Sequence, residues 1–227
     1  MVVALLGALL VAPLVGLVLG LVVGALIALA LHRSATGAVR RAVGGRPADP
    51  VAHARLVNLV DKLATGAGVP VPDLVVVDDE APNALAAGLE PRTGFVAVTT
   101  GLLGALDRVQ LEGVLAHELA RLKSHDTRPG TIAVPLLRWF GWVPGAEQRI
   151  VAGALGPGRL AEADLQGVAI TRYPPALAAA LERLAADGRP TRAPASVAHL
   201  WIDPPLGDVD PLVRPPLEER IAALREL

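Results

Sequence analysis

The stretch that decides the fold is Leu111-Glu112-Gly113-Val114-Leu115-Ala116-His117-Glu118-Leu119-Ala120-Arg121. Its apolar residues recur at helical spacing, which predicts a largely buried helix over residues 106–123. His117 and Glu118 match the first two positions of His-Glu-x-x-His, a helical motif whose two histidines bind one zinc ion. The fifth position of the motif holds Arg121 instead of histidine.

Arg121 changes what this helix can do. Residues i and i+4 lie about 40° apart around a helix and one turn along it, so two imidazoles there share a metal ion. A guanidinium has no lone pair and stays protonated, so it cannot ligate zinc. At about 4 Å and an effective dielectric near 20 it would repel Zn²⁺ by roughly 8 kcal/mol, before solvent and ligand charges reduce that figure. His125 lies about 12 Å further along a continuous helix than His117, out of reach of the same ion.

The elements around this helix are short. Two β-branched runs, Leu74–Val77 and Phe95–Thr99, predict two strands of one small sheet. Asp49 is expected to cap a helix that ends near residues 66–68. Residues 131–156 are apolar but interrupted by charges, so we expect an interfacial or partly buried hairpin there and not a membrane crossing. Further helices are predicted at about residues 160–170, 174–186 and 215–227.

The N-terminal segment is apolar without interruption. From Val2 to Leu31 there is no charged residue, a run of 30 positions, whereas about 20 suffice to cross the hydrocarbon core as a helix. A cleaved signal peptide is the main rival, because residues 28–30 resemble a cleavage site, but no basic segment precedes the run and the run is too long. A two-helix hairpin broken at Pro13 would have arms too short to cross. A single tilted transmembrane helix fits better.

Basic residues follow this run and none precedes it. The positive-inside rule therefore places the following domain in the cytoplasm, at the cell membrane, behind a single crossing. We expect a transmembrane helix over residues 1–32, a basic linker over 33–48 and one folded domain over 49–227. The arginines behind this orientation are Arg33, Arg40, Arg41 and Arg46.

Composition excludes some classes of protein. The chain has 21 Lys and Arg against 22 Asp and Glu, a net charge of −1, so there is no electrostatic case for nucleic acid as a partner. It has no cysteine, which excludes disulfides and thiolate metal sites. Only the five histidines and the carboxylates are left as candidate zinc ligands.

The chain resembles the HtpX-type and CAAX-prenyl-protease family of zinc metallopeptidases. In that family the zinc-site helix follows a strand that ends in a Thr-Gly-Leu-Leu turn, which is similar to Thr99-Thr100-Gly101-Leu102-Leu103. Pro82-Asn83-Ala84 looks like the family's Pro-Asn-Ala motif on the substrate-side edge, and Asp126 matches the Asp after the helix. This part of the resemblance runs from about Pro50 to Arg128.

The resemblance resumes at Arg159-Leu160-Ala161-Glu162-Ala163-Asp164, which is similar to the family's Arg-Glu-x-x-Ala-Asp stretch. There the Glu is the third zinc ligand and the Asp supports the site, whereas this chain has Leu160 at the ligand position. Residues 215–221 look like the family's C-terminal helix, with Arg214 where a His usually stands. The resemblance implies an α+β, mainly helical, zincin-like metallopeptidase domain with a small sheet, besides the transmembrane helix.

The resemblance also implies a role for each site residue. Glu118 corresponds to the general base, here vestigial, and His117 is the only surviving family ligand, with no metal expected on it. Asp164 and Arg121 would support the site, and Asn83 would lie at the substrate groove. The simplest alternative is an ion pair between Glu118 and Arg121 at i,i+3, with His117 buried and hydrogen-bonded to Asp164 or to a backbone carbonyl. A sharper hypothesis places the Arg121 guanidinium where zinc would lie, neutralising both Glu118 and Asp164.

Other histidines and tryptophans are open to simpler interpretations. Trp139, Trp142 and Trp201 could mark a membrane-interface belt, or be scattered core or loop residues. Surface or loop positions are expected for His32, His53 and His199.

Two of the three zinc ligands are thus replaced, by Arg121 and Leu160. The expected function is that of a membrane-anchored, noncatalytic pseudopeptidase without a cofactor, which binds or regulates membrane-associated proteins. An extended peptide would add as a strand in a groove near Asn83 and residues 95–99.

Two alternatives stay open. The first is an active zinc endopeptidase of membrane-protein quality control, which would need a displaced Arg121 and a third ligand such as Glu162 or Asp164. The second is a purely structural membrane subunit, which would tolerate changes at Asn83 and Glu118.

Overall fold

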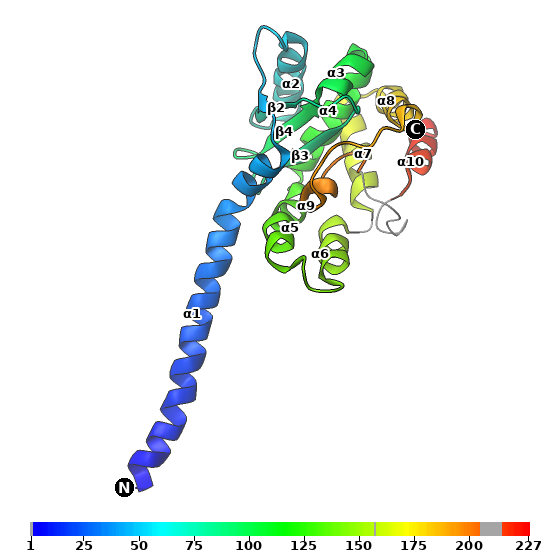
Figure 1. The fold of residues 1–227 in the computed structure, drawn as a ribbon. Coiled ribbons are helices and arrows are strands. Elements are labelled where there is room, and N and C mark those ends of the chain that lie inside the picture. The colour runs from blue at the N-terminus through cyan, green and yellow to red at the C-terminus, as the bar shows by residue number, and fades with distance from the viewer. Residues whose placement is uncertain (1, 157, 205–214) are drawn as a thin grey trace. The chain divides into compact units, whose positions relative to one another are not determined.

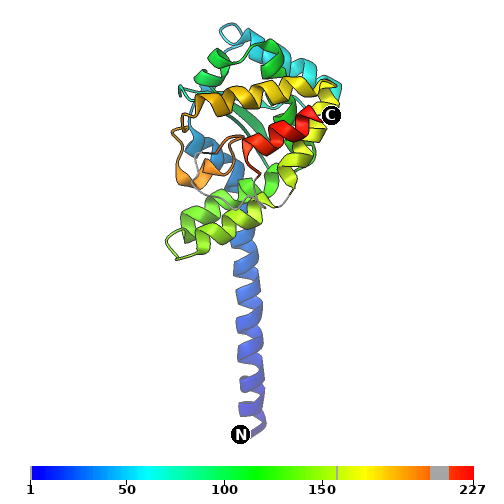
Figure 2. The same cartoon turned by 90° about the vertical axis from the view of Figure 1, so that its right-hand side faces the viewer.

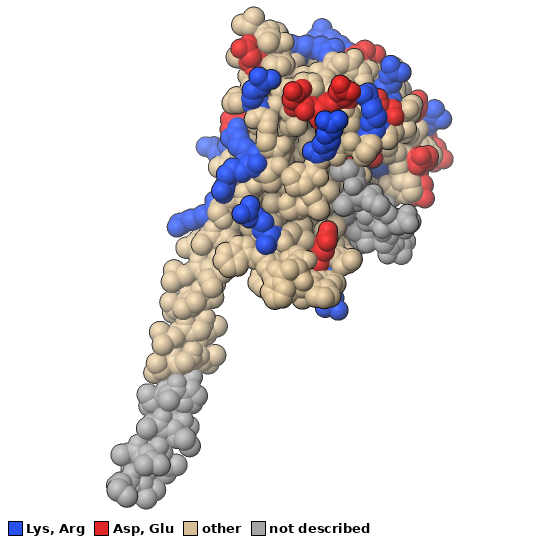
Figure 3. Space-filling view, in the orientation of Figure 1, with Lys and Arg blue, Asp and Glu red and all other residues tan. Residues whose placement is uncertain are grey.

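The chain forms two compact units, Met1–Ser34 and Ala35–Leu227. The structure is a computed structural model, and it describes residues 2–156, 158–204 and 215–227. The first unit belongs to helix α1 (Val2–Val43), in which Val15–Val43 is long and apolar enough to cross a membrane, with a mean hydropathy of 2.5. The large apolar side chains from Val15 to Leu29 are exposed, and Figure 3 shows no charged surface on the described part of this run.

The second unit begins inside the expected basic linker. Helix α1 continues to Val43, and Ala35 and Val39 are completely buried. Strand β1 (Arg46–Pro47) then pairs antiparallel with β2 (Asp73–Val77). Most of residues 33–48 is therefore folded structure, because α1 turns apolar side chains toward the domain at four-residue spacing.

The sheet has the strand order β1-β2-β4-β3. The two strands expected from the sequence are confirmed as β2 and β4 (Phe95–Thr99), which pair in parallel with Val76 opposite Val98. Strand β3 (Ala84–Ala87) pairs antiparallel with β4 and was not predicted. It consists of three alanines and a leucine, all buried, and follows a Pro-Asn turn, so it shows neither β-branching nor polar alternation.

Both faces of the sheet are covered, as period-two side-chain alternation allows. One face contributes Val76, Val96 and Val98 to the main core, which also contains side chains of helices α2 (Ala54–Ala67), α4 (Arg108–Lys123) and α8 (Pro174–Asp187). The opposite face packs on the end of α1, on α5 (Thr127–Phe140) and on residues 197–201. Its side chains are those of Val75, Leu85, Ala87, Phe95 and Ala97.

The expected helix at 106–123 is α4 (Arg108–Lys123), preceded by a separate short helix, α3 (Thr100–Ala105). A capping box separates them: the Asp107 carboxylate accepts from the backbone N–H of Gln110, and the Gln110 side chain accepts from the N–H of Asp107. Asp49 does not cap α2. Its carboxylate accepts from the N–H groups of Val51 and Ala52 in a turn, and α2 starts at Ala54.

The remaining chain is helical. Residues 131–156 fall in a helical hairpin made of α5 (Thr127–Phe140) and α6 (Ala146–Leu155), visible in Figures 1 and 2. The helices predicted near 160–170, 174–186 and 215–227 are confirmed, and Figure 2 shows the last of them beside α8. They are α7 (Arg159–Thr171), α8 (Pro174–Asp187) and α10 (Leu217–Arg225), with the short α9 (Ala195–Ala198) before α10. The α+β, mainly helical class is confirmed.

Gly113 sets how closely α8 approaches α4. A Cβ atom at this position would lie 2.6 Å from the backbone N of Leu177 and 2.8 Å from the carbonyl carbon of Ala176. Backbone atoms cannot rotate away as a side chain can, so α8 would have to move.

We expect Gly113→Ala to lower the free energy of unfolding by about 1–3 kcal/mol through overpacking. Gly66→Ala is the matched control, because Gly66 is an exposed α2 residue with nothing within 4 Å of its would-be Cβ. That change should raise stability by about 0.5–1 kcal/mol through helix propensity. Denaturant unfolding of both variants in mild detergent, followed by circular dichroism, measures the difference; equal effects would refute the close approach of α8.

Candidate functional site

The site is built on the middle of α4. His117 and Glu118 are completely buried and Arg121 is only 6% exposed. Helix α7 approaches α4 closely at this point because Gly167 has no side chain: a Cβ there would lie 2.9 Å from the backbone N and Cα of His117. The approach brings Asp164, nearly one turn before Gly167, to the imidazole of His117.

Asp164 is the centre of the first charge cluster. Its Oδ1 lies 2.7 Å from His117 Nδ1, and Arg220 of α10 donates to both its carboxylate oxygens at 2.8 Å. Arg220 also donates to the carbonyl of Ile202 at 3.2 Å. Burial alone would raise the pKa of Asp164, but the charge and hydrogen bonds of Arg220, and then those of His117, hold it well below its usual range. Asp164 is therefore a carboxylate at neutral pH.

Arg121 is the centre of the second cluster. Its Nη1 donates to Glu118 Oε2 at 3.1 Å and to the carbonyl of Leu200 at 3.2 Å, and its Nε lies 3.5 Å from Asp126 Oδ2. Arg159, the first residue of α7, donates to the other Asp126 oxygen at 3.2 Å. The guanidinium of Arg121 thus lies between two carboxylates in the interior of the domain.

The end of α4 brings Asp126 into this cluster. The N–H of Asp126 donates to the carbonyl of Arg121 at 3.0 Å, and the N–H of His125 to that of Leu122 at 3.2 Å, the pattern of a Schellman motif. His125 occupies the left-handed position with φ of 61°, where glycine is usual. This turn reverses the chain over the last turn of α4, so that Asp126 reaches back to Arg121.

The hypothesis that Arg121 neutralises both buried carboxylates is half right. The ion pair with Glu118 is present, but Asp164 is paired with Arg220, which the sequence analysis did not single out. A signal existed: Leu217, Arg220, Ile221 and Leu224 share one face of α10 at i, i+3, i+4 and i+7. A lone arginine on an apolar stripe indicates a buried ion pair.

The donor set here does not fit a catalytic zinc ion, which takes three protein ligands. Nδ1 of His117 faces Asp164. The other ring nitrogen, Nε2, is buried and has no hydrogen-bond partner among the described residues, which is the state expected of a nitrogen that binds a metal ion. Arg121 and Leu160 supply no second or third ligand, and both line a cavity of only about 10 Å³. Across residues 2–156, 158–204 and 215–227, no group of three or more histidines and carboxylates is placed to hold a metal ion.

Asn83 is only 2% exposed, and its side chain is hydrogen-bonded to other residues of the domain. Its amide nitrogen donates to Thr191 Oγ1 at 2.7 Å and to the carbonyl of Asp203. Strand β4 is an inner strand, so a peptide strand added on the side of Asn83 would pair with β3, the edge strand there. There the backbone already forms a bridge between Leu85 and Trp201, and the N–H of Ile202 donates to the carbonyl of Ala84 at 2.8 Å. A groove role for Asn83 stays a prediction.

Two side chains near α9 are buried. His199 lies in the turn after α9, which agrees with the expected loop position, but it is 1% exposed, with Nε2 3.0 Å from the carbonyl of Gly130, so a surface position is wrong. Trp201 is also 1% exposed. His199 and Trp201 are buried because residues 199–202 pack between β3 and α5. This long-range contact cannot be predicted from the Pro-rich sequence around it.

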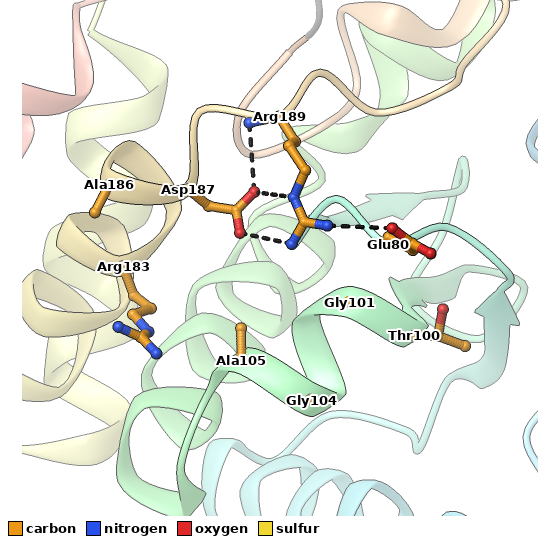
Figure 4. A pocket seen from close by; sticks show the side chains of 9 residues that line it. All are labelled: Glu80, Thr100, Gly101, Gly104, Ala105, Arg183, Ala186, Asp187 and Arg189. Atoms are coloured by element: carbon orange, nitrogen blue, oxygen red, sulfur yellow. Dashed lines mark hydrogen bonds and ion pairs between the residues drawn. The ribbon is translucent and has the colours of Figure 1, made fainter.

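A pocket of about 580 Å³ lies away from these clusters (Figure 4). Glu80, α3 and the end of α8 line it, and Arg189 crosses its mouth between Asp187, at 2.7 Å, and Glu80, at 3.3 Å. None of the predicted site residues lines this pocket.

The fold is that of a metallopeptidase domain of the zincin type. A buried helix carries His117-Glu118, a small sheet lies beside it, and Asp164 lies on the neighbouring helix α7. Comparison with known proteins agrees: the profile of "Peptidase family M48" matches residues 50–227. A "Protease HtpX homolog" of Tropheryma whipplei (strain Twist) is 37% identical, over 76% of this chain and 72% of the relative. Similar proteins of the same description occur in Caldanaerobacter subterraneus subsp. tengcongensis, 34% identical over 82% and 76%, and in Acidiphilium cryptum, 34% identical over 84% and 79%. The chain belongs to peptidase family M48.

Replacing Arg220 tests the first cluster. We expect Arg220→Met to lower the free energy of unfolding by about 3–5 kcal/mol, because Asp164 becomes a buried carboxylate without its main partner. Since the pKa of Asp164 is lowered on folding, its contribution is complete above about pH 4 and is lost as the pH falls further. The variant should lose this acid-side dependence.

Arg225→Met is the matched control on the same helix, because Arg225 pairs with Glu182 at 2.7 Å but is exposed. Its cost should be at most about 1 kcal/mol. Unfolding curves of both variants at several pH values decide the matter; similar costs for the two arginines would contradict a buried ion pair at Arg220.

Replacing Arg121 tests the second cluster. Arg121→Met should destabilise the domain by about 3–5 kcal/mol, because Glu118 is then left buried and charged. Adding Glu118→Gln should restore part of that loss, because the uncompensated charge is gone. The double-mutant cycle is read from unfolding free energies, and additive costs would show that the two side chains do not interact.

Proposed function

We propose that this protein is a membrane-anchored, noncatalytic member of peptidase family M48, which binds membrane-associated proteins without cleaving them. One observation carries the proposal: the Arg121 guanidinium, at the second ligand position of the helical motif, is buried between Glu118 and Asp126. A cation that the fold holds in place thus stands at a ligand position, and its charge opposes the binding of a zinc ion there.

The second support is the hydrogen bonding of Glu118, the residue that corresponds to the general base. Glu118 would have to accept a proton from a metal-bound water, yet one of its oxygens is bonded to Arg121. Leu160, at the third ligand position, adds only apolar surface to the small cavity that it shares with Arg121.

The anchor is α1, whose apolar run is long enough to cross a membrane. The arginines that follow it support a cytoplasmic position of the domain at the cell membrane, by the positive-inside rule. An extended peptide of a membrane-associated partner would pair with β3 by strand addition. An incoming strand has to replace Trp201 and Ile202, which occupy that edge in the structure.

An active zinc endopeptidase is the alternative, favoured by the HtpX-like relatives and by the intact pairing of His117 with Asp164. It requires Arg121 to leave Glu118 and another side chain to enter as a ligand. A purely structural membrane subunit, the third possibility, requires neither a site nor a groove.

The deciding experiment is the zinc content of the full chain, purified in mild detergent and measured by atomic spectroscopy. The unaltered protein should hold far less than one zinc per chain, because only His117 can serve as a ligand. The double variant Arg121→His with Leu160→Glu should gain close to one zinc per chain, because it restores the three-ligand set.

A third variant serves as control. Adding His117→Ala to the double variant should abolish the gained zinc, which distinguishes a rebuilt site from metal bound elsewhere on the surface. Near-stoichiometric zinc in the unaltered protein, or cleavage of an unfolded protein substrate that a chelator stops, would refute the noncatalytic function and support the active peptidase.

A further inference from the structure

Exposed aromatic residues gather at one point of the domain. The chain has three Trp, two Phe and one Tyr. Trp139, Phe140 and Trp142, here called the aromatic tip, are 69%, 49% and 81% exposed. Phe95 and Trp201, in contrast, are each 1% exposed. Half of the aromatic side chains in the protein are thus presented to the surroundings within four consecutive positions.

The aromatic tip has a defined geometry. It lies where α5 ends and the chain turns into α6, at the end of the hairpin seen in Figure 2. The N–H of Gly141 donates to the carbonyl of Leu137 at 2.8 Å, and that of Val143 to the carbonyl of Phe140 at 2.9 Å. The indole N–H of Trp142 donates to the carbonyl of Trp139 at 2.8 Å. The turn thereby satisfies polar groups internally, while the rings stay outside the core.

The base of the hairpin is anchored in the domain. Val134 of α5 is 1% exposed and belongs to the same apolar cluster as Val39, near the end of α1. The domain unit starts at Ala35, and the apolar run of α1 ends only a few residues earlier in the chain. A bilayer that holds this run is therefore covalently tethered within a few residues of the domain, so a weak second contact is made at high effective concentration.

The chemistry of the aromatic tip fits the headgroup region of a bilayer. Indole rings are enriched there because they have a large apolar surface and one polar N–H. Arg138, next to the aromatic tip, and Arg149 of α6 are exposed and can reach lipid phosphates while their methylene chains lie along apolar surface. No charged residue lies between Trp139 and Ala146, so insertion of the turn leaves no charge to desolvate.

We propose that the aromatic tip inserts into the headgroup region of the membrane that α1 crosses. The domain is then held at the bilayer at a second point, independent of what binds at β3 or at the former zinc site. This contact restricts the rotation of the domain about its anchor and presents a constant face to the lipid.

The absence of cysteine allows a direct test on the full chain. Trp142→Cys, or separately Trp139→Cys, is labelled with a nitroxide and reconstituted into neutral phosphatidylcholine vesicles. Collision rates with oxygen, which concentrates in lipid, and with a water-soluble nickel chelate are then measured. Tyr173→Cys, an exposed site before α8, is the aqueous control, and Leu21→Cys, in the apolar run, is the lipid control.

We expect the ratio of oxygen to nickel collisions at positions 142 and 139 to be several-fold higher than at 173, and closer to the ratio at 21. Ratios equal to that at 173 would overturn the proposal. Protection of the label from nickel that grows with the protein-to-lipid ratio would also overturn it, because that indicates contact with a second copy of the chain. Protection that appears only with anionic lipid would overturn it too, because that assigns the contact to the arginines alone. A collision ratio at position 21 equal to that at 173 would show that the apolar run of α1 is not in the bilayer. It would refute both the anchor and the insertion of the aromatic tip.

Discussion

The structure depends on a buried guanidinium. Arg121 lies in the middle of the most buried helix of the domain, where an unpaired cation would cost several kcal/mol, so the surrounding chain must supply carboxylates. Glu118 and Asp126 do so, and their pairs join α4 to the turn before α5 and to the start of α7. A separate cluster around Asp164 joins α4 and α7 to α10. Three carboxylates face three guanidinium groups and one imidazole. Glu118, Asp126 and Asp164 are the acids, and Arg121, Arg159 and Arg220 are the bases.

The packing of the metallopeptidase fold does not rest on the residues at the ligand positions. Gly113 and Gly167 still bring α8 and α7 against α4, and both faces of the sheet are still covered. Helix α4 can therefore keep its place while a ligand position becomes arginine. Membership of family M48 describes the fold, whereas catalysis depends on the side chains at the site.

Sequence periodicity was enough to predict α4, β2 and β4, since each combines a strong apolar pattern with a clear boundary. It missed β3, because a strand buried on both faces and made of alanine shows no alternation. The i,i+3 pair of Arg121 with Glu118 follows from helix geometry and was predictable. The pairing of Asp164 with Arg220 was not, because it joins residues 56 positions apart in the chain and depends on how α10 packs. His199 was misplaced for the same reason: its burial comes from a long-range contact with α5.

The clusters around Arg121 and Arg220 have a consequence for how the domain matures. In a site built for a metal ion, a buried acid is neutralised by a solute that must arrive from outside, so the finished fold depends on ion supply in the cell. Here the counter-charges are attached to the chain and are made with it. These ion pairs can therefore form while the chain folds, without any solute, and the pair of Asp164 with Arg220 responds to the proton concentration.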